Sequence, residues 1–109
     1  MDEHDFRKKC DAALEDLRKR LLELGDAHGF EVEGEGDKLE LQFEDAEGTR
    51  FVISPNAAAR QIWISALVTS FKLSWSDAAG GFVLDKTGET LSQVMGRILT
   101  QQLGAAVEV

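Results

Sequence analysis

Apolar residues near the start of the chain recur every three or four positions, the spacing of one face of an α-helix. The stripe consists of Phe6, Cys10, Ala13, Leu14, Leu17, Leu21 and Leu24. Asp2 or Asp5 can cap the start of this helix, and Gly25 can take the left-handed conformation that ends it. The pattern therefore predicts an amphipathic helix of about five turns.

From residue 30 onward, apolar residues alternate with polar ones, as in half-buried β-strands. Six such stretches are predicted, at 30–35, 38–44, 50–54, 61–65, 71–75 and 82–85. The segment "SPNAAA" at 54–59 interrupts the alternation before the fourth stretch. The connections are too short for crossover helices, so the pattern predicts an antiparallel meander with one solvated face.

Helical spacing returns near the end of the chain. Thr90–Gln93, "TLSQ", has the form of a capping box, and Gly104 can end the helix that follows. Both helices must cover the same face of the sheet, because only one face is apolar. The prediction is an α+β fold: a two-layer sandwich with N- and C-terminal helices on one face of a roughly six-stranded antiparallel sheet, in a single domain of residues 1–109.

Charge is distributed unevenly along the chain. Residues 1–50 contain 16 acidic and 8 basic side chains, whereas residues 51–109 contain 4 of each, so the first half carries the whole net charge of −8. Such a field disfavours nucleic acid and anionic membranes as partners and favours cations or a basic protein surface.

The chain's start, "MDEHDFRKKC", is charged and lacks the apolar region of a signal peptide, and no stretch approaches the roughly 20 apolar residues of a membrane span. Cys10 is the only cysteine, which excludes an internal disulfide and a zinc site built on cysteine pairs. Its place in the apolar stripe indicates a buried small hydrophobe rather than a nucleophile. We expect a cytoplasmic protein.

The solvated face of the predicted sheet carries many carboxylates near its first edge. Alternate carboxylates diverge rather than enclose an ion, and neither His4 nor His28 stands in a ligand spacing, so any metal site would be weak and unselective. A solvated charged face is the simpler interpretation. No phosphate loop, nucleophile elbow or catalytic triad is present, so no catalytic residues are expected.

The stretch "RQIWIS" places Ile62 and Ile64 on the buried face and Trp63 on the solvated one. An exposed Trp often anchors a protein interface. The alternative is that the ring packs across the strands on Val52 and the stem of Lys72. The residues alone leave both interpretations open.

Several of these stretches together resemble the frataxin family, specifically its bacterial branch. They are "DFRKKCDAALEDLRKRL", "LELQFEDAEGTRFVIS", "RQIWIS" and "LDKTGETLSQVMGRILTQQLG", which cover nearly the whole chain. The resemblance implies the same α-β-α sandwich. It also implies a protein that binds iron (Fe2+/Fe3+) weakly and works in iron–sulfur cluster assembly, modulating cysteine desulfurase activity and donating or sensing iron.

The resemblance also implies site residues and partners. The expected partners are the cysteine desulfurase and the iron–sulfur scaffold protein, with no nucleic acid and no membrane. The expected state is a monomer, with an iron-dependent oligomer as the alternative. The carboxylates expected at the acidic ridge that meets iron are Asp11, Glu23, Asp26, Glu31 and Glu33. The residues expected to contact a partner on the open sheet face are Gln61, Trp63 and Lys72.

The chain departs from the family pattern in two places. Several ridge positions that carry acids in relatives hold other residues here, namely Arg7, Lys19, Leu22, Gly25 and Gly29. Ser54 and Ala58 replace an Asn and a Pro before the Trp strand. A thinner ridge and altered loop contacts are therefore expected.

Two other functions remain as alternatives. One is a small acidic secretion chaperone or other protein-interaction module, and the other is a ferroxidase.

Overall fold

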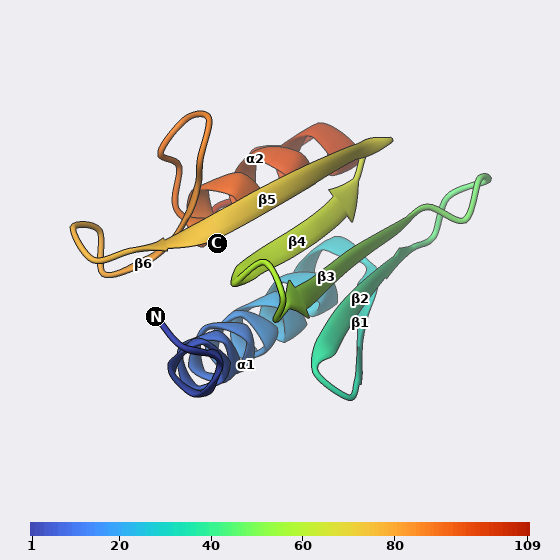
Figure 1. Ribbon diagram of the computed structural model, residues 1–109. Helices are drawn as coiled ribbons and strands as arrows, with labels where there is room; N and C mark the ends of the chain where they lie inside the picture. The colour runs from blue at the N-terminus through green and yellow to red at the C-terminus, as the bar shows by residue number, and fades with distance from the viewer.

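The computed structural model describes residues 1–109. The elements follow the order α1 (Glu3–His28), β1 (Phe30–Glu35), β2 (Lys38–Phe43), β3 (Arg50–Asn56), β4 (Gln61–Ala66), β5 (Thr69–Ser76), β6 (Gly81–Leu84) and α2 (Leu91–Leu103). Figure 1 shows a helix at each end of the chain and six strands between them. Neither helix is long and apolar enough to cross a bilayer.

The six strands form one sheet in the order β1-β2-β3-β4-β5-β6, with every neighbouring pair antiparallel. This is the meander that the short connections predict. α1 packs mainly against β1 and β2, and α2 packs against β6 (Figure 1). No element covers the other face of the sheet, so the predicted two-layer sandwich is confirmed.

The core lies between the helices and the inner face of the sheet. It is one cluster of 23 buried apolar residues, drawn from both helices, all six strands and the C-terminal tail. No polar or charged residue is buried with them, so the side chains of the core are all apolar. Cys10 is part of this cluster, as the apolar stripe predicts.

The first helix is longer than its apolar stripe. Asp2 caps its start by accepting a hydrogen bond from the backbone N–H of Asp5, but the helix ends at Gly29 (φ 79°), so the prediction of a stop at Gly25 is wrong. Gly25 is buried inside the helix, where a Cβ would lie 2.5 Å from the carbonyl oxygen of Phe30. This glycine is needed because the backbone of Phe30 packs closely against the helix at this position, and not because the chain makes a left-handed turn there.

The third strand is also longer than the alternation indicates, because it continues through "SPN" as far as Asn56. Ser54 lies opposite Trp63, and Pro55 lies opposite Ile62. The pairing with β2 ends at Ile53, so Pro55 has a strand neighbour on one side only, where the missing N–H of a proline is tolerated. The strand therefore does not end where the proline indicates.

The second helix has both predicted end signals. Thr90 and Gln93 form a reciprocal capping box, and Gly104 ends the helix with a φ of 69°. The tail then returns against α2, where Val107 is buried and its backbone N–H donates to the hydroxyl of Thr100 at 3.0 Å. The tail thus contributes to the core.

Candidate functional site

The outer face of the sheet is acidic at its β1 edge. Strand register places Glu31 opposite Gln42 and Glu33 opposite Glu40, so two carboxylates face each other across the strands. The neighbours relieve this repulsion: the Gln42 amide donates to the Glu33 carboxylate at 3.2 Å, and Arg50 forms an ion pair with Glu40 at 3.2 Å. Glu31 has no such partner within the chain, so its carboxylate is free.

The end of α1 adds a further carboxylate to this edge. Asp26, Glu31 and Glu33 line one hollow of about 380 Å³, together with Leu22, Phe30 and Val32. Asp26 and Glu31 make no hydrogen bond or ion pair with other side chains, so their oxygens are available to an external cation. Leu22 is 40% exposed and gives the hollow an apolar wall. Three of the five predicted ridge carboxylates are therefore brought together.

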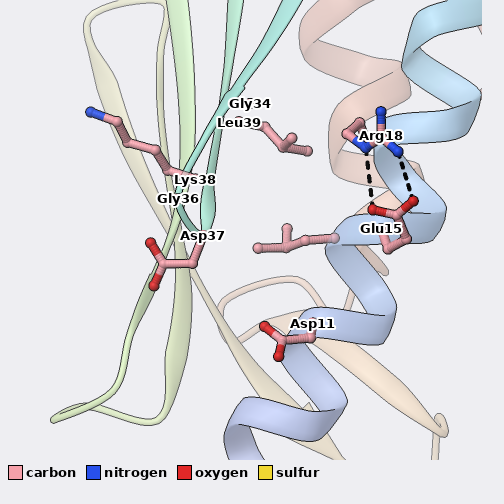
Figure 2. A pocket seen from close by; sticks show the side chains of 9 residues that line it. Asp11, Glu15, Arg18, Gly34, Gly36, Asp37, Lys38 and Leu39 are labelled. Atoms are coloured by element: carbon pink, nitrogen blue, oxygen red, sulfur yellow. Dashed lines mark hydrogen bonds and ion pairs between the residues drawn. The ribbon is translucent and has the colours of Figure 1, made fainter.

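The other two predicted ridge residues lie elsewhere. Asp11 lines a separate hollow of about 510 Å³ between α1 and the β1–β2 turn. Figure 2 shows its carboxylate directed toward that turn, whereas the carboxylate of Asp37 points away from the helix. In the same hollow Glu15 and Arg18 are paired at 2.7 Å. Glu23 is exposed one helical turn before Asp26 and lines neither hollow.

These carboxylates can attract iron but do not enclose it. Carboxylate oxygens suit hard cations, whereas selective iron sites usually add imidazole ligands. No three His, Cys, Asp or Glu side chains converge closely enough to hold a metal ion, and His28 is exposed outside the group. The chemistry of the donor set therefore fits weak, exchangeable binding through one or two carboxylates.

A second group of side chains occupies the middle of the open sheet face. The Trp63 indole N–H donates to the Gln61 side-chain oxygen at 2.9 Å, and the Gln61 amide donates to the Ser74 hydroxyl at 3.2 Å. Ser74 in turn donates to the Asp85 carboxylate at 3.2 Å. This Trp63 network connects β4, β5 and the loop after β6, so it holds the indole in one orientation.

Lys72 completes this group. It lies directly across from Trp63 in the strand register, and its ammonium nitrogen lies 4.8 Å from the centre of the indole ring. This cation–π contact agrees with the packing interpretation of Trp63. The ring nevertheless remains 36% exposed, so the packing fixes the ring and leaves part of it open to a partner. The predicted residues Gln61, Trp63 and Lys72 thus adjoin one another.

Comparison with known proteins extends this picture. The profile of the family described as "Frataxin-like domain" matches residues 1–105, nearly the whole chain. The chain belongs to the frataxin family. The family resemblance carried by "RQIWIS" and the C-terminal stretch is confirmed.

Individual frataxin relatives are distant in sequence but similar in extent. The "Iron-sulfur cluster assembly protein CyaY" of Azotobacter vinelandii is 22% identical over 95 residues, covering 87% of this chain and 86% of the relative. The protein of the same name in Pseudomonas aeruginosa is 30% identical over 79 residues, covering 72% and 71%. A solved frataxin from Psychromonas ingrahamii, 18% identical, superposes with a TM-score of 0.75 over 99% of this chain and 97% of its own. The last similarity confirms the fold.

The structure places two of the positions where a departure from the family ridge is expected. Leu22 lines the hollow beside Asp26, and Gly25 is buried against the backbone of Phe30. An acid at position 25 would meet the carbonyl oxygen of Phe30, so the helix cannot carry a carboxylate there. The hollow therefore takes its free carboxylates from Asp26 of α1 and Glu31 of β1.

Sequence reasoning missed two contributors to the site. Asp85 accepts the last hydrogen bond of the Trp63 network, although alternation identifies it only as an outward residue. The Arg50–Glu40 pair removes one carboxylate from the free acidic edge. Only the strand register could reveal this pair, because the two residues are ten positions apart in the sequence.

Proposed function

We propose that this frataxin acts in iron–sulfur cluster assembly as an iron-binding protein that regulates a cysteine desulfurase. The observation that carries the proposal is the combination of unpaired carboxylates at the β1 edge, Asp26 and Glu31, with an open sheet face that presents an oriented Trp63 on β4. Membership of the frataxin family and the names of the CyaY relatives support the same pathway.

The two surfaces would have different tasks in docking. A cluster of carboxylates on a chain of net charge −8 accelerates encounter with a basic protein surface and helps to set its orientation. Trp63, held by Gln61 and Lys72, can then bury the exposed part of its ring against the desulfurase or the scaffold protein. Because the ring is already ordered, little side-chain entropy would be lost on binding.

Iron is cargo or signal in this proposal rather than a resident cofactor. The ridge carboxylates, Asp26, Glu31 and Glu33, would hold it weakly, and their occupation would reduce the negative charge offered to the desulfurase. Iron would therefore modulate the same electrostatic contact that steers docking. This coupling provides a physical route from iron level to desulfurase rate.

The acidic edge is tested by charge reversal. Glu31→Lys/Glu33→Lys should weaken desulfurase binding by about tenfold or more at low salt and reduce its salt dependence. The matched control is Glu47→Lys/Glu108→Lys, which makes the same change of net charge at exposed positions away from the hollow. For both double variants, a pull-down at low and high salt measures desulfurase binding, and a sulfide-release assay measures the desulfurase rate. Equal losses in the two double variants would show a net-charge effect and contradict the assigned edge.

The Trp63 surface is tested by Trp63→Ala, with Trp63→Phe as the control that keeps an aromatic ring. We expect a folded Ala variant whose complex is weakened by roughly 1–3 kcal/mol, as for an interface anchor. Unchanged binding would assign Trp63 to sheet packing alone.

Iron binding has a separate test, because it does not require the desulfurase. Titration with ferrous iron, followed by amide NMR, should broaden signals near Asp26, Glu31 and Glu33 before others. Glu31→Gln/Glu33→Gln should reduce this broadening. Changes confined to residues outside 11–35 would contradict the assignment.

A further inference from the structure

The sheet has an incomplete edge beside β5. This strand spans Thr69–Ser76, but its pairing with β6 covers only Leu73–Ser76. After Leu84 the chain turns away through a loop that folds back on itself, with the N–H groups of Thr87 and Gly88 bonded to the carbonyl of Leu84. Residues 69–72 therefore have a strand neighbour on the β4 side only.

The backbone groups exposed along this edge follow from the β4–β5 turn. Leu67 and Val68 both have positive φ, which is the type I′ geometry, so the flanking pair Ala66–Thr69 is hydrogen-bonded. Hydrogen-bonded and non-hydrogen-bonded pairs alternate along antiparallel strands. Ser70 and Lys72 accordingly direct their N–H and C=O groups away from β4. The register pair Leu73–Leu84 directs the Lys72 carbonyl toward the backbone N–H of Asp85, so the unclaimed groups are the N–H and C=O of Ser70 and the N–H of Lys72.

A notch of about 540 Å³ lies along this edge. Its lining includes the edge residues 69–72, the loop residues Asp85, Lys86 and Thr87, and Arg97 from α2. The lining carries three cations against one carboxylate, in a chain whose net charge is −8. Arg97 is held by two hydrogen bonds from its guanidinium to Glu89, at 2.9 and 3.0 Å, whereas Lys86 has no ion-pair partner.

Each side of the notch carries a cation, but only the inner side also has apolar side chains. On the inner side the Arg97 guanidinium lies 5.5 Å from the ring of half-buried Phe71, and Leu84 lies nearby. On the outer side lies Lys72. An added strand would place alternate side chains against these two environments. The matching sequence alternates apolar and acidic residues.

We propose that this notch binds an extended acidic segment of a partner protein, added to the sheet as a short strand beside residues 69–72. Charge complementarity favours an acidic segment, and the free N–H and C=O groups of Ser70, with the free N–H of Lys72, favour an extended backbone. A second copy of this chain fits less well, because pairing two β5 edges would bring their lysines together. The notch lies apart from the acidic edge but shares Gln61 and Lys72 with the Trp63 group. Its test uses a peptide alone, so it does not depend on whether a desulfurase binds.

The test uses the full chain and a synthetic probe, the capped peptide Val-Glu-Val-Glu-Val-Glu. Titration followed by amide NMR should shift signals of the notch first, at Ser70, Lys72 and Thr87. The peptide Glu-Glu-Glu-Val-Val-Val, with equal charge and composition but no alternation, should bind at least about threefold more weakly, the equivalent of one net hydrogen bond. Equal affinity for the two peptides would overturn the strand-addition model.

Two variants separate the backbone and charge contributions. Ser70→Pro removes an outward N–H without removing a bond to β4, and should weaken the alternating peptide roughly three- to tenfold, whereas Ser70→Ala should change binding less than about twofold. Lys86→Glu should weaken binding by a similar factor at low salt. Its control is Lys19→Glu, an equal charge change on the exposed side of α1.

Other outcomes would overturn the proposal. Peptide-induced shifts confined to residues outside the notch would place the binding elsewhere. If neither Ser70→Pro nor Lys86→Glu changed the affinity for the alternating peptide, the peptide would bind outside the notch. Self-association in sedimentation that Ser70→Pro abolishes would identify a second copy, rather than an acidic peptide, as the occupant of the edge.

Discussion

The two faces of the sheet are made by alternate residues of the same strands, yet they are organised differently. Phe51 is fully buried under the helices, and its neighbour Val52 is half-buried on the open face. The inner face contributes only apolar side chains to the core, whereas the outer face holds an ion pair, a cation–π contact and the Trp63 network. Stability and recognition are therefore assigned to opposite sides of one layer.

This separation explains how a frataxin can change its recognition surface without losing its fold. Apolar burial is non-directional, so many apolar residues satisfy the inner face. Recognition on the outer face depends on particular charges and hydrogen bonds. The solved frataxin that shares the fold at 18% identity is consistent with a core that tolerates extensive substitution.

The largest difference between the faces is expected in the free energy of unfolding, when two neighbouring residues, one on each face, are truncated to alanine. Phe51→Ala should lower the free energy of unfolding by about 3–5 kcal/mol, because it removes a fully buried ring from the core. Val52→Ala should cost about 1 kcal/mol or less, since Val52 is only half-buried. Urea unfolding followed by circular dichroism measures both. Similar losses would show that the open face contributes to stability as much as the core does.

A chemical test asks how well the inner face excludes solvent. Burial, followed by the nearby Asp11 and Asp37 carboxylates, raises the pKa of the Cys10 thiol from 9.0 to about 12. Alkylation at pH 8 should therefore be slower than in the unfolded chain by roughly a thousandfold, because the thiolate is the reacting species. Mass spectrometry with iodoacetamide, with and without urea, measures the ratio. Rapid labelling of the native chain would contradict a closed inner face.

The same pKa shift sets a pH dependence. The folded state favours the neutral thiol, so its contribution to stability is complete below the unfolded pKa of 9.0. It declines as pH rises from there toward about 12, since only the unfolded chain ionises readily in that interval. A Cys10→Ala variant should lose this part of the alkaline destabilisation in urea titrations.

Gly25 tests the junction between α1 and the inner face. Gly25→Ala should destabilise the protein by roughly 1–2 kcal/mol despite alanine's higher helix propensity, because the new Cβ would lie 2.5 Å from the carbonyl oxygen of Phe30. Gly34→Ala is the control, since its Cβ would have no heavy atom closer than 3.9 Å. Thermal unfolding distinguishes them. A stabilised Gly25→Ala variant would mean that the backbone at Phe30 can move away.

The smallest effect is expected at the hairpin that carries Trp63 and Lys72. Val68 is fully exposed and has a φ of 60°, a strained conformation for a β-branched residue. Val68→Gly and Val68→Asn should each stabilise the protein by about 1 kcal/mol, because both residues accept positive φ in a type I′ turn. Val68→Ala, which retains most of the strain, should change little. A destabilised Gly variant would show that Val68 is not strained.

Particular residues show where sequence reasoning succeeds and fails. Alternation in "RQIWIS" places Trp63 outward, and the capping box at Thr90 locates the start of α2. The sequence pattern wrongly marks Gly25 and Pro55 as element ends, because the role of each residue depends on a neighbour that the local pattern does not show. Gly25 makes room for Phe30, and Pro55 lies beyond the last partner on β2.

The site shows the same division. Sequence reasoning identified the acidic residues and the Trp63 surface, but it could not show that Asp26 shares a hollow with Glu31 and Glu33 while Asp11 does not. Nor could it show that Arg50 neutralises Glu40. Such assignments depend on helix position and strand register, which local patterns do not specify.

By itself, the sequence determined the order and type of the elements, the face that each strand buries and the acidic character of the first half. These follow from local periodicity and composition, which act over a few residues. The tertiary structure alone decided which carboxylates meet, which are neutralised, and that the edge of β5 at 69–72 lacks a strand partner. The reason is physical: charge pairing and strand completion act through space, between residues that the fold brings together from distant parts of the chain.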